Sequence, residues 1–424
     1  MSGFTRADAP APPTPAALQQ QVTTLMRSPN VDQAFQYLEQ TAGLTNRQMV
    51  VLNEIPAPPF GESARAETFR DMLLQAGLEQ CVMDAAGNVI GRIKGRTGAR
   101  QIALIAHLDT VFPVDTDVTV RIDGDRFAAP GIGDNARGLA LMLAVARALQ
   151  RASWTFEDDV LLIGSVGEEG LGDLSGVRHL FRPDAAPISS VIAVDGGAMT
   201  RIVTSAVGSN RYRVTFAGPG GHSYGSFGRA NPHHALGDAI STFRQQAAEV
   251  VAEEGAKATF SVGRIGGGTS INSIAFESWM EVDMRSVDPD RLAALDAVLH
   301  RSIQAALERE NAARTEGSAL SVAVTSVGKR PAGQQDVRLP LIQSAIAVQR
   351  ALGIEPSLVA SSTDANVPIA AGIPAITVSR GGVSGNAHSL AEFWQDVDAR
   401  KSEQQVLLLL ALEATLIRGE VPGD

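Results

Sequence analysis

The residues of this sequence best suited to chemistry are histidines and carboxylates that follow short apolar runs. His107 and Asp109 come directly after the run 101–106 (QIALIA), in the order His-Leu-Asp. Residues two apart in an extended chain point to the same side, so both can face one cavity, where Asp109 could bond the free nitrogen of the imidazole. A comparable place, after an apolar run or before an apolar helix pattern, is shared by Asp134, Glu168, Glu169, Asp195 and His388.

Each of these residues has an ordinary explanation when it is taken singly. Asp134 precedes the helix pattern of 135–152 and could be its N-cap, and the adjacent Glu168 and Glu169 could belong to a solvated loop. Together, however, histidines and several carboxylates at successive strand ends would bring many negative charges into one cleft, which is hard to hold without cations. Imidazole and carboxylate ligands without thiolate suit two zinc ions, with Mn or Co as substitutes.

The composition excludes other ligands and several classes of partner. The chain of 424 residues has one cysteine, Cys81, so a metal must be held by His, Asp and Glu. The formal net charge of -10 argues against a nucleic-acid partner, whose phosphates would be repelled. No stretch approaches the ~18 apolar residues of a membrane span, and the start, MSGFTRADAPAPPTPAA, lacks the apolar segment of a secretory signal. We therefore expect a cytoplasmic protein.

The elements that must position these residues follow an α/β pattern. Short apolar runs at 101–106, 159–166, 188–194 and 375–379 are typical of strands buried on both faces of a sheet, and helix patterns alternate with them. In open α/β folds ligands bind at the carboxyl edge of the sheet, which is where the histidines and carboxylates fall. The sequence predicts an α/β fold with a central, mostly parallel sheet.

The pattern changes near Ser209, where an inserted domain is expected. Strand and helix signals then follow in the order β-α-β-β-α-β, which is the order of a ferredoxin-like α+β domain. We therefore predict a catalytic α/β domain made of 18–208 and 326–424, interrupted by a second domain at 209–325.

The N-terminal part has a simpler expected organisation. The Pro- and Ala-rich segment 1–17 is predicted to be a disordered arm. A single helix is expected from Leu18 to Leu44, and another from Ser63 to Ala76, ending at the C-cap residue Gly77.

Six motifs resemble those of the two-zinc exopeptidases and deacylases, a family that includes glutamate carboxypeptidase, peptidase T, carnosinase, acetylornithine deacetylase and succinyl-diaminopimelate desuccinylase. They are AHLDTVFP, GIGDNARG, SVGEEGLG, AVDGG, GGHS and NAHSLAEFW, in the family's order and approximate spacing over nearly the whole chain after the arm. The segment SSTDANVPIAAGIPA looks most like the peptidase-T-like branch. The resemblance implies a zinc-dependent exopeptidase α/β domain with an inserted α+β lid, which the family usually uses for dimerisation, and hence a homodimer through 209–325.

The resemblance also implies a role for each matching residue in the α/β domain. It implies that five residues hold two zinc ions per chain: His107 and Asp195 one ion, Glu169 and His388 the other, and Asp134 both. Glu168 would be the general base that takes a proton from the metal-activated water and returns it to the leaving amine. Asp109 would orient His107.

The inserted domain supplies three further candidates through the same resemblance. His222, in GPGGHSYG, would come over from the partner subunit and stabilise the oxyanion. Asn272 and Arg285 would hold the carboxylate of the substrate, for which the fork of an arginine is well suited. Without the family context, each could equally be a turn residue or a surface hydrogen-bond or salt-bridge partner.

The substrate stays open between two kinds of amide. We expect an exopeptidase that acts on di- or tripeptides, and the alternative is an N-acyl-amino-acid deacylase, since both cleave an amide bond. A partner for a free α-amine would separate them, and Asp364 and Asn366 are candidates for it. A non-catalytic peptide-binding relative would have lost a ligand or the base, and none is lost. A metallophosphatase would need basic residues near the motifs, and no such run is present.

Overall fold

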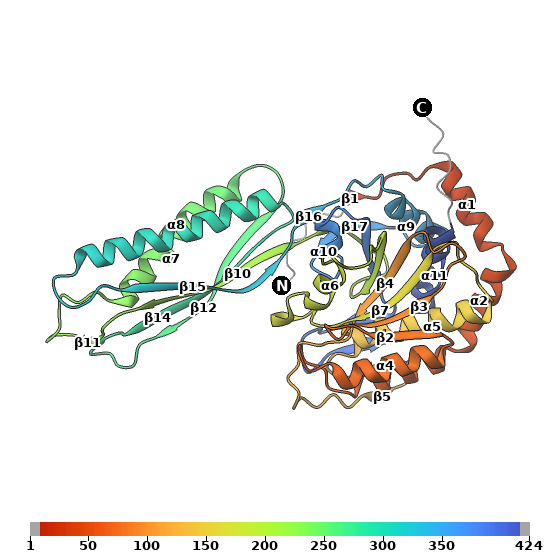
Figure 1. Cartoon of the computed structure of the whole chain (residues 1–424), viewed down its shortest axis with the longest axis horizontal. Helices are drawn as coiled ribbons and strands as arrows, with labels where there is room; N and C mark the ends of the chain where they lie inside the picture. The colour runs from red at the N-terminus through yellow and green to blue at the C-terminus, as the bar shows by residue number, and fades with distance from the viewer. Residues whose placement is uncertain (1–8, 416–424) are drawn as a thin grey trace. The chain divides into compact units, whose positions relative to one another are not determined.

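The chain folds into two compact units in the computed structural model, which describes residues 9–415 (Figure 1). Unit 1 consists of Met1–Ala206 together with Gln335–Asp424, and unit 2 is the continuous segment Val207–Gln334. Unit 2 is therefore an insertion into unit 1. It extends beyond the expected 209–325 because its last long strand continues to Arg330.

Unit 1 is built around a sheet whose central strands are parallel. β18, β8, β4 and β7 pair in parallel, whereas β3 and β2 pair antiparallel at one side. This confirms the predicted α/β class with a mostly parallel central sheet. The strands in spatial order are β1 (Ala9–Pro10), β17 (Ser357–Ser361), β9 (Arg201–Ala206), β18 (Ala375–Ser379), β8 (Ser190–Asp195), β4 (Gln101–His107), β7 (Asp159–Ser165), β3 (Val89–Ile93) and β2 (Gln80–Met83).

Helices cover both faces of this sheet, which explains why its central strands are continuously apolar (Figure 1). In β4, Ile102 and Leu104 pack into one buried cluster, whereas Ala103 and Ile105 pack into a second cluster on the opposite face. The helices of unit 1 are α1 (Ala16–Met26), α2 (Pro29–Gln40), α3 (Ala42–Asn53), α4 (Ser63–Gln75), α5 (Arg137–Arg151), α6 (Ser175–Leu180), α9 (Pro340–Ala351), α10 (Asn366–Ala370) and α11 (Arg400–Thr415).

The N-terminal segment differs from the expectation of one long helix. The chain from Leu18 to Leu44 is divided among α1, α2 and α3, so the prediction of a single helix is wrong. The break between α1 and α2 has a local cause: the Ser28 hydroxyl accepts a hydrogen bond from the backbone N–H of Val31, and Pro29 occupies the first helical position. Residues 9–17 of the expected arm belong to the fold, since β1 pairs with β17 and α1 begins at Ala16; residues 1–8 lie outside the described range.

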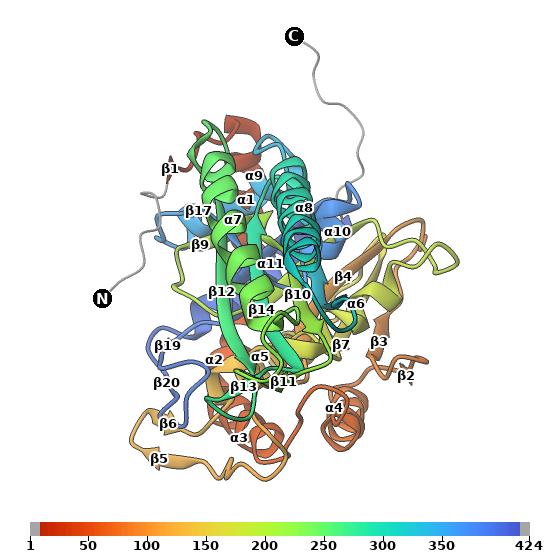
Figure 2. The same ribbon diagram turned by 90° about the vertical axis from the view of Figure 1, so that its left-hand side faces the viewer.

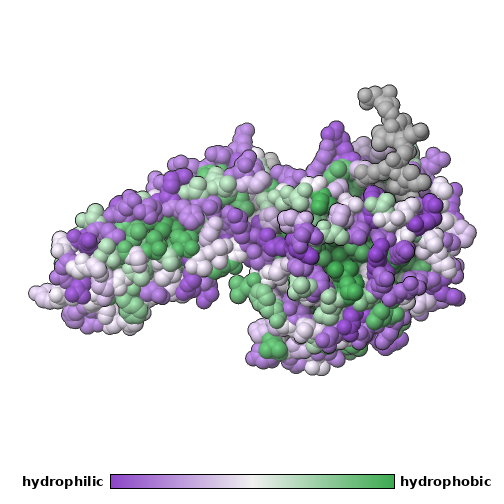
Figure 3. All heavy atoms as spheres, in the orientation of Figure 1, coloured by the Kyte–Doolittle hydropathy of each residue, from purple (hydrophilic) through white to green (hydrophobic). Residues whose placement is uncertain are grey.

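Unit 2 has the ferredoxin-like arrangement that its element order predicted. Its four long strands pair antiparallel in the order β12-β14-β10-β15, and α7 and α8 pack side by side on one face (Figure 2). Burial alternates strictly along β14, as a sheet with one covered face requires. The outer edge of the helix layer is mostly hydrophilic, with hydrophobic residues nearer the sheet (Figure 3). The elements are β10 (Gly208–Ala217), β11 (Gly221–His222), α7 (Pro232–Ala252), β12 (Ala258–Gly267), β13 (Ser273–Ile274), β14 (Glu277–Ser286), α8 (Pro289–Ala313) and β15 (Ser321–Arg330).

A small antiparallel sheet in unit 1 lies beside the start of α5. Its strands in order are β19 (Val383–Gly385), β20 (Phe393–Gln395), β6 (Arg126–Ala128) and β5 (Arg121–Asp123). This sheet brings the loop between β19 and β20, which contains His388, next to the segment that follows β6 and contains Asp134. Within residues 9–415, no helix combines the length and apolar character needed to cross a membrane.

Candidate metal centre

The carboxyl ends of three parallel strands supply most of the candidate ligands. His107 is the last residue of β4, Asp195 is the last residue of β8, and Glu168 and Glu169 follow the end of β7. Since these strands run in parallel, their ends meet at one edge of the sheet. His107, Glu168 and Glu169 are each less than a tenth exposed, so the two glutamates do not form a solvated loop.

Asp134 lies between the two histidines and turns one carboxylate oxygen toward each. Its Oδ1 is 3.2 Å from Nε2 of His107, and its Oδ2 is 3.4 Å from Nε2 of His388. Nε2 of His388 is also 3.0 Å from Oε1 of Glu169, and Nε2 of His107 is 3.9 Å from Oδ1 of Asp195. Among residues 9–415, three groups have ligand atoms within 4.8 Å of one another, and two of them share Asp134. These two are His107, Asp134 and Asp195, and Asp134, Glu169 and His388; the third is His107, Glu168 and Glu169.

The explanation of Asp134 as a helix N-cap is wrong. α5 begins at Arg137, its N-cap residue is Ala136, and no side chain caps it. Asp134 lies in a tight turn, Ile132–Ala136, in which Asp134 and Asn135 have non-helical backbone angles and are joined by a cis peptide bond. This turn directs the Asp134 carboxylate at the histidines instead of the helix.

Asp109 holds both the His107 ring and the loop that carries the two glutamates. Nδ1 of His107 lies 3.0 Å from the backbone oxygen of Asp109 and 3.6 Å from its carboxylate. This contact assigns a proton to Nδ1, so Nε2, which faces Asp134, is the nitrogen that could bind a metal. The buried carboxylate of Asp109 accepts hydrogen bonds from the backbone N–H groups of Glu168 and Glu169, at 3.0 and 2.7 Å.

The charges in this cluster shift the pKa values in opposite directions. Burial alone would raise the pKa of Asp134, but Arg380 and the two histidines outweigh it and hold that pKa well below its usual range. Hydrogen bonds to Asp134 and Glu169 raise the pKa of His388 to about 10. Burial lowers the pKa of His107, yet Asp109 and Asp134 raise it well above the ordinary value. Without metal, protons on the histidines therefore offset the carboxylate charge.

Three buried charged residues beside the cluster have no counterpart in the sequence-based site. Arg380, which follows β18, has its Nη1 3.4 Å from both Asp134 and Asp195. The Glu392 carboxylate accepts three backbone N–H groups around Asp134, and the Glu62 carboxylate accepts the N–H of Gly167. Arg380 and Glu392 carried a usable signal, since one follows a buried strand and the other lies within the NAHSLAEFW motif. For Glu62 we find no signal.

The two candidates for binding a free α-amine, Asp364 and Asn366, are buried in unit 1. Asp364 is 4% exposed, and its Oδ2 accepts a hydrogen bond of 2.6 Å from the Ser165 hydroxyl. Burial raises the pKa of Asp364 to about 6. Asn366 is fully buried, and its Oδ1 accepts the backbone N–H of Thr363. Both side chains are buried in this structure, and their suggested role in binding a substrate amine stays a prediction.

His222 lies in unit 2, on the exposed loop that begins with β11. Its Nδ1 accepts hydrogen bonds from the backbone N–H groups of Tyr224 and Gly225, both at 3.2 Å. These contacts assign the ring proton to Nε2, which is left to donate outward. Ser223 donates its backbone N–H to the backbone oxygen of Asn272, so His222 and Asn272 lie at the same end of unit 2.

Arg285 lies at the opposite end of unit 2 from Asn272. It pairs in register with Ser209, near the junction with unit 1, whereas Asn272 lies beyond Glu277 at the other end of β14. Eight residues of extended strand separate Glu277 from Arg285, which corresponds to about 26 Å. Arg285 and Asn272 of one chain therefore do not hold the same carboxylate together. The guanidinium of Arg285 is 40% exposed and donates to Asp283.

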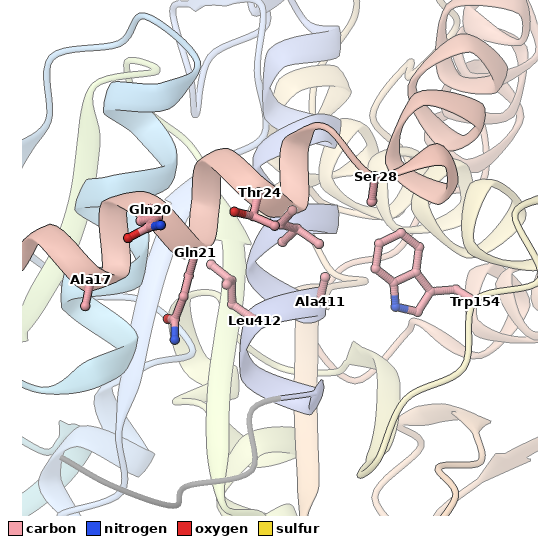
Figure 4. A pocket seen from close by; sticks show the side chains of 9 residues that line it. Ala17, Gln20, Gln21, Thr24, Ser28, Trp154, Ala411 and Leu412 are labelled. Atoms are coloured by element: carbon pink, nitrogen blue, oxygen red, sulfur yellow. The ribbon is translucent and has the colours of Figure 1, made fainter. Parts of the chain in front are cut away.

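A separate cavity of unit 1 has no part in this centre. Its volume is about 690 Å³, and it is lined by residues of α1 and α11 together with Ser28 and Trp154 (Figure 4). None of its lining residues is a carboxylate, a histidine or a cysteine. The cavity therefore offers neither a metal ligand nor a general base, and the chemistry belongs to the strand ends.

Comparison with known proteins gives two matches to family models. Residues 88–244 match the model of Peptidase family M28, and residues 204–311 match the model of the Peptidase dimerisation domain. The first match covers every candidate ligand except His388, and the second covers His222, Asn272 and Arg285. Where the two matches overlap, the structure divides the units after Ala206.

Individual proteins point to the same class. Carboxypeptidase G2 of Pseudomonas sp. (strain RS-16) is 35% identical over 110 residues, which is 26% of either protein. The aminopeptidase PepT of Bacillus cereus superposes with a TM-score of 0.70 at 19% identity, over 87% of this chain and 97% of its own. YXEP of Bacillus subtilis, described as a dinuclear metal-binding peptidase from the M20 family, superposes with a TM-score of 0.65 at 18% identity, over 89% and 99%.

The fold and the matches define the chain as a hydrolase of the metallopeptidase class. Within that class it combines a region of the Peptidase family M28 type with a Peptidase dimerisation domain. The stretch aligned with carboxypeptidase G2 is about a quarter of that protein's length, so the relationship assigns the class and not the substrate.

Proposed function

We propose that the chain is a two-zinc exopeptidase that cleaves the amide bond of di- or tripeptides. One observation carries the proposal: the carboxylate of Asp134 turns Oδ1 to His107 and Oδ2 to His388, so Asp134 would be able to give one oxygen to each of two ions. Asp195 would complete the first site and Glu169 the second. Nitrogen and oxygen donors without thiolate fit zinc, with Mn or Co as substitutes.

The roles of the residues follow from where their polar atoms lie. Two bound zinc ions would supply a water of lowered pKa and an electrophile for the substrate carbonyl. Glu168, buried at the end of β7, takes the proton of that water and returns it to the leaving amine. The carboxylate of Asp109 keeps Glu168 in place by accepting its backbone N–H, and the backbone oxygen of Asp109 fixes the proton of His107 on Nδ1.

Stabilisation of the developing oxyanion falls to His222 in this proposal. Its Nε2–H is free to donate because Nδ1 already accepts two backbone N–H groups. The match to a dimerisation domain supports a homodimer in which His222 serves the partner's centre. Arg285 and Asn272, at opposite ends of unit 2, would then bind substrate from different copies.

The alternative is an N-acyl-amino-acid deacylase, since the metal centre cleaves either kind of amide. An exposed partner for a free α-amine would favour the peptidase over the deacylase. The two candidates for this role, Asp364 and Asn366, are buried, so they do not separate the two activities. The similarity to an aminopeptidase, PepT, and to carboxypeptidase G2 favours peptides. A screen of the zinc-loaded protein against free dipeptides, tripeptides and N-acetyl-amino acids tests the choice, and turnover confined to the acetylated compounds would contradict the peptidase.

We expect Arg285 to bind a free C-terminal carboxylate of the substrate. Amidation of the substrate C-terminus should lower kcat/KM of the wild type roughly 30-fold, the lower end of the range for a lost charge-assisted contact, because Arg285 is partly exposed. In Arg285→Ala the acid and the amide should become nearly equal. Arg264→Ala is the matched control, since Arg264 is also an exposed arginine of the same sheet, paired with Glu281, and should keep the wild-type ratio. Equal cleavage of both substrates by the wild type would remove Arg285 from the carboxylate site.

A further inference from the structure

Glu392 lies at the base of the loop that carries His388. The strands β19 and β20 pair as a hairpin whose connecting loop contains His388, and Glu392 directly precedes β20. The loop is closed by its own hydrogen bonds: Glu392 donates its backbone N–H to the backbone oxygen of Ser389, and Asn386 donates to that of Ala391. The position of His388 is therefore tied to the position of Glu392.

The side chain of Glu392 reaches across to the segment that carries Asp134. Its Oε2 accepts the backbone N–H of Gly131 at 3.0 Å, and its Oε1 accepts those of Gly133 and Asp134 at 3.0 and 2.9 Å. The carboxylate is 1% exposed, so water does not replace these bonds. Gly133 permits the close approach, because a Cβ there would come within 3.1 Å of both Glu392 and Arg380.

The surrounding sheet holds the two segments in register. β20 pairs with β6, so that Phe393 lies opposite Ala128, a few residues before Gly131. Trp394, fully buried, donates its indole N–H to the backbone oxygen of Gly381 and anchors the other side of the hairpin. Glu392 thus joins the His388 loop to the backbone of the Asp134 turn by side-chain hydrogen bonds.

We propose that Glu392 is a positioning residue that couples the His388 loop to the Asp134 turn and so assembles the second metal site. The inference rests on the proposed two-zinc function. His107 and Asp195 end buried strands of the main sheet, whereas the His388 side chain is about half exposed and its place depends on a loop. The first site is therefore less dependent on Glu392 than the second, although both share Asp134.

The test is a zinc titration of the metal-free Glu392→Gln protein. Glutamine has the same shape as glutamate, but an NH2 group replaces one carboxylate oxygen. At least one of the three backbone N–H donors would then face this NH2 group and lose its acceptor. Loss of such an outer partner typically weakens metal binding 10–100-fold. We expect that loss for one equivalent of zinc, a much smaller change for the other, and a smaller rise of Tm on zinc addition than in the wild type.

Asp125→Asn is the matched control for the loss of one carboxylate in the same small sheet. Asp125 is exposed and contacts Gln395, the last residue of β20, whereas no hydrogen bond or ion pair within residues 9–415 joins it to any of the candidate ligands. A purely structural role of Glu392 would lower Tm equally with and without zinc. The inference would be overturned if Glu392→Gln bound both equivalents of zinc with unchanged affinity, or if Asp125→Asn weakened zinc binding equally. Either result would leave the proposed two-zinc function intact. A wild type that binds fewer than two zinc ions would overturn the proposed function and the inference with it.

Discussion

Replacement of Glu168 by alanine should lower turnover on the order of 100-fold or more, the contribution expected of a general base, while zinc content stays near that of the wild type. The two adjacent glutamates make this a discriminating experiment. Glu169 has its Oε1 3.0 Å from Nε2 of His388 and groups with Asp134 and His388 as a ligand. Glu168 shares with it the anchoring of the loop to Asp109, so removal of its carboxylate leaves that anchor intact.

Glu169→Ala is the companion variant, because it should lose zinc together with activity. The measurements are kcat on the substrate found by screening and zinc content by elemental analysis of the same samples. His107, Glu168 and Glu169 also form a group of potential ligands within 4.8 Å. If zinc is lost from Glu168→Ala and kept by Glu169→Ala, the two roles must be exchanged.

Mixing of two inactive variants should restore activity if His222 acts across the dimer. His222→Ala chains mixed with Glu168→Ala chains would form hybrids in which one of the two centres has an intact Glu168 and an intact His222. With equal chains and random exchange, half of the dimers are hybrids, so activity should return to about a quarter of the wild type. His222 suits this role because its Nδ1 accepts two backbone N–H groups, which leaves the ring proton on Nε2 to donate.

The control for this experiment is a mixture in which both variants damage the metal centre. Glu168→Ala chains mixed with Asp134→Ala chains contain no intact centre, so no activity should return. Subunit exchange is verified with chains of different tags. Exchange without recovery in the first mixture would place His222 in its own chain's centre or outside the reaction.

The sequence predicted the sheet and its ligand-bearing edge because short apolar runs identify strands buried on both faces. QIALIA became β4 because its alternate residues pack into two different clusters, one on each face of the sheet. The histidine and carboxylates that follow such strands could then be placed together from topology alone. The inserted unit was predictable for a similar reason, since burial alternates along β14 with period two.

The parts that could not be predicted depend on long-range contacts. The tight turn at Asp134 is held by contacts with Glu392, which lies more than two hundred residues further along the chain. The local sequence instead favours Asp134 as a helix N-cap. Arg380 and Glu392 carry signals in the sequence, but their contacts with Asp134 join groups that are distant in sequence and could not be predicted from it. Asp364 and Asn366 resemble substrate ligands in sequence, but tertiary packing buries them. The break between α1 and α2, by contrast, could have been predicted, because Ser28 is a favourable N-cap residue and Pro29 follows it at the first helical position.

The most direct test of the two-metal centre is a calorimetric titration of the metal-free protein with zinc in buffers of different ionisation enthalpy. The pKa of His388 is raised to about 10, so below that pH the ring carries a proton that a metal must displace. The account predicts two equivalents of zinc per chain, a heat that depends on the buffer with release of at least about one proton, and an apparent affinity that rises as the pH rises toward 10. Binding of fewer than two equivalents, or a heat independent of the buffer, would contradict it.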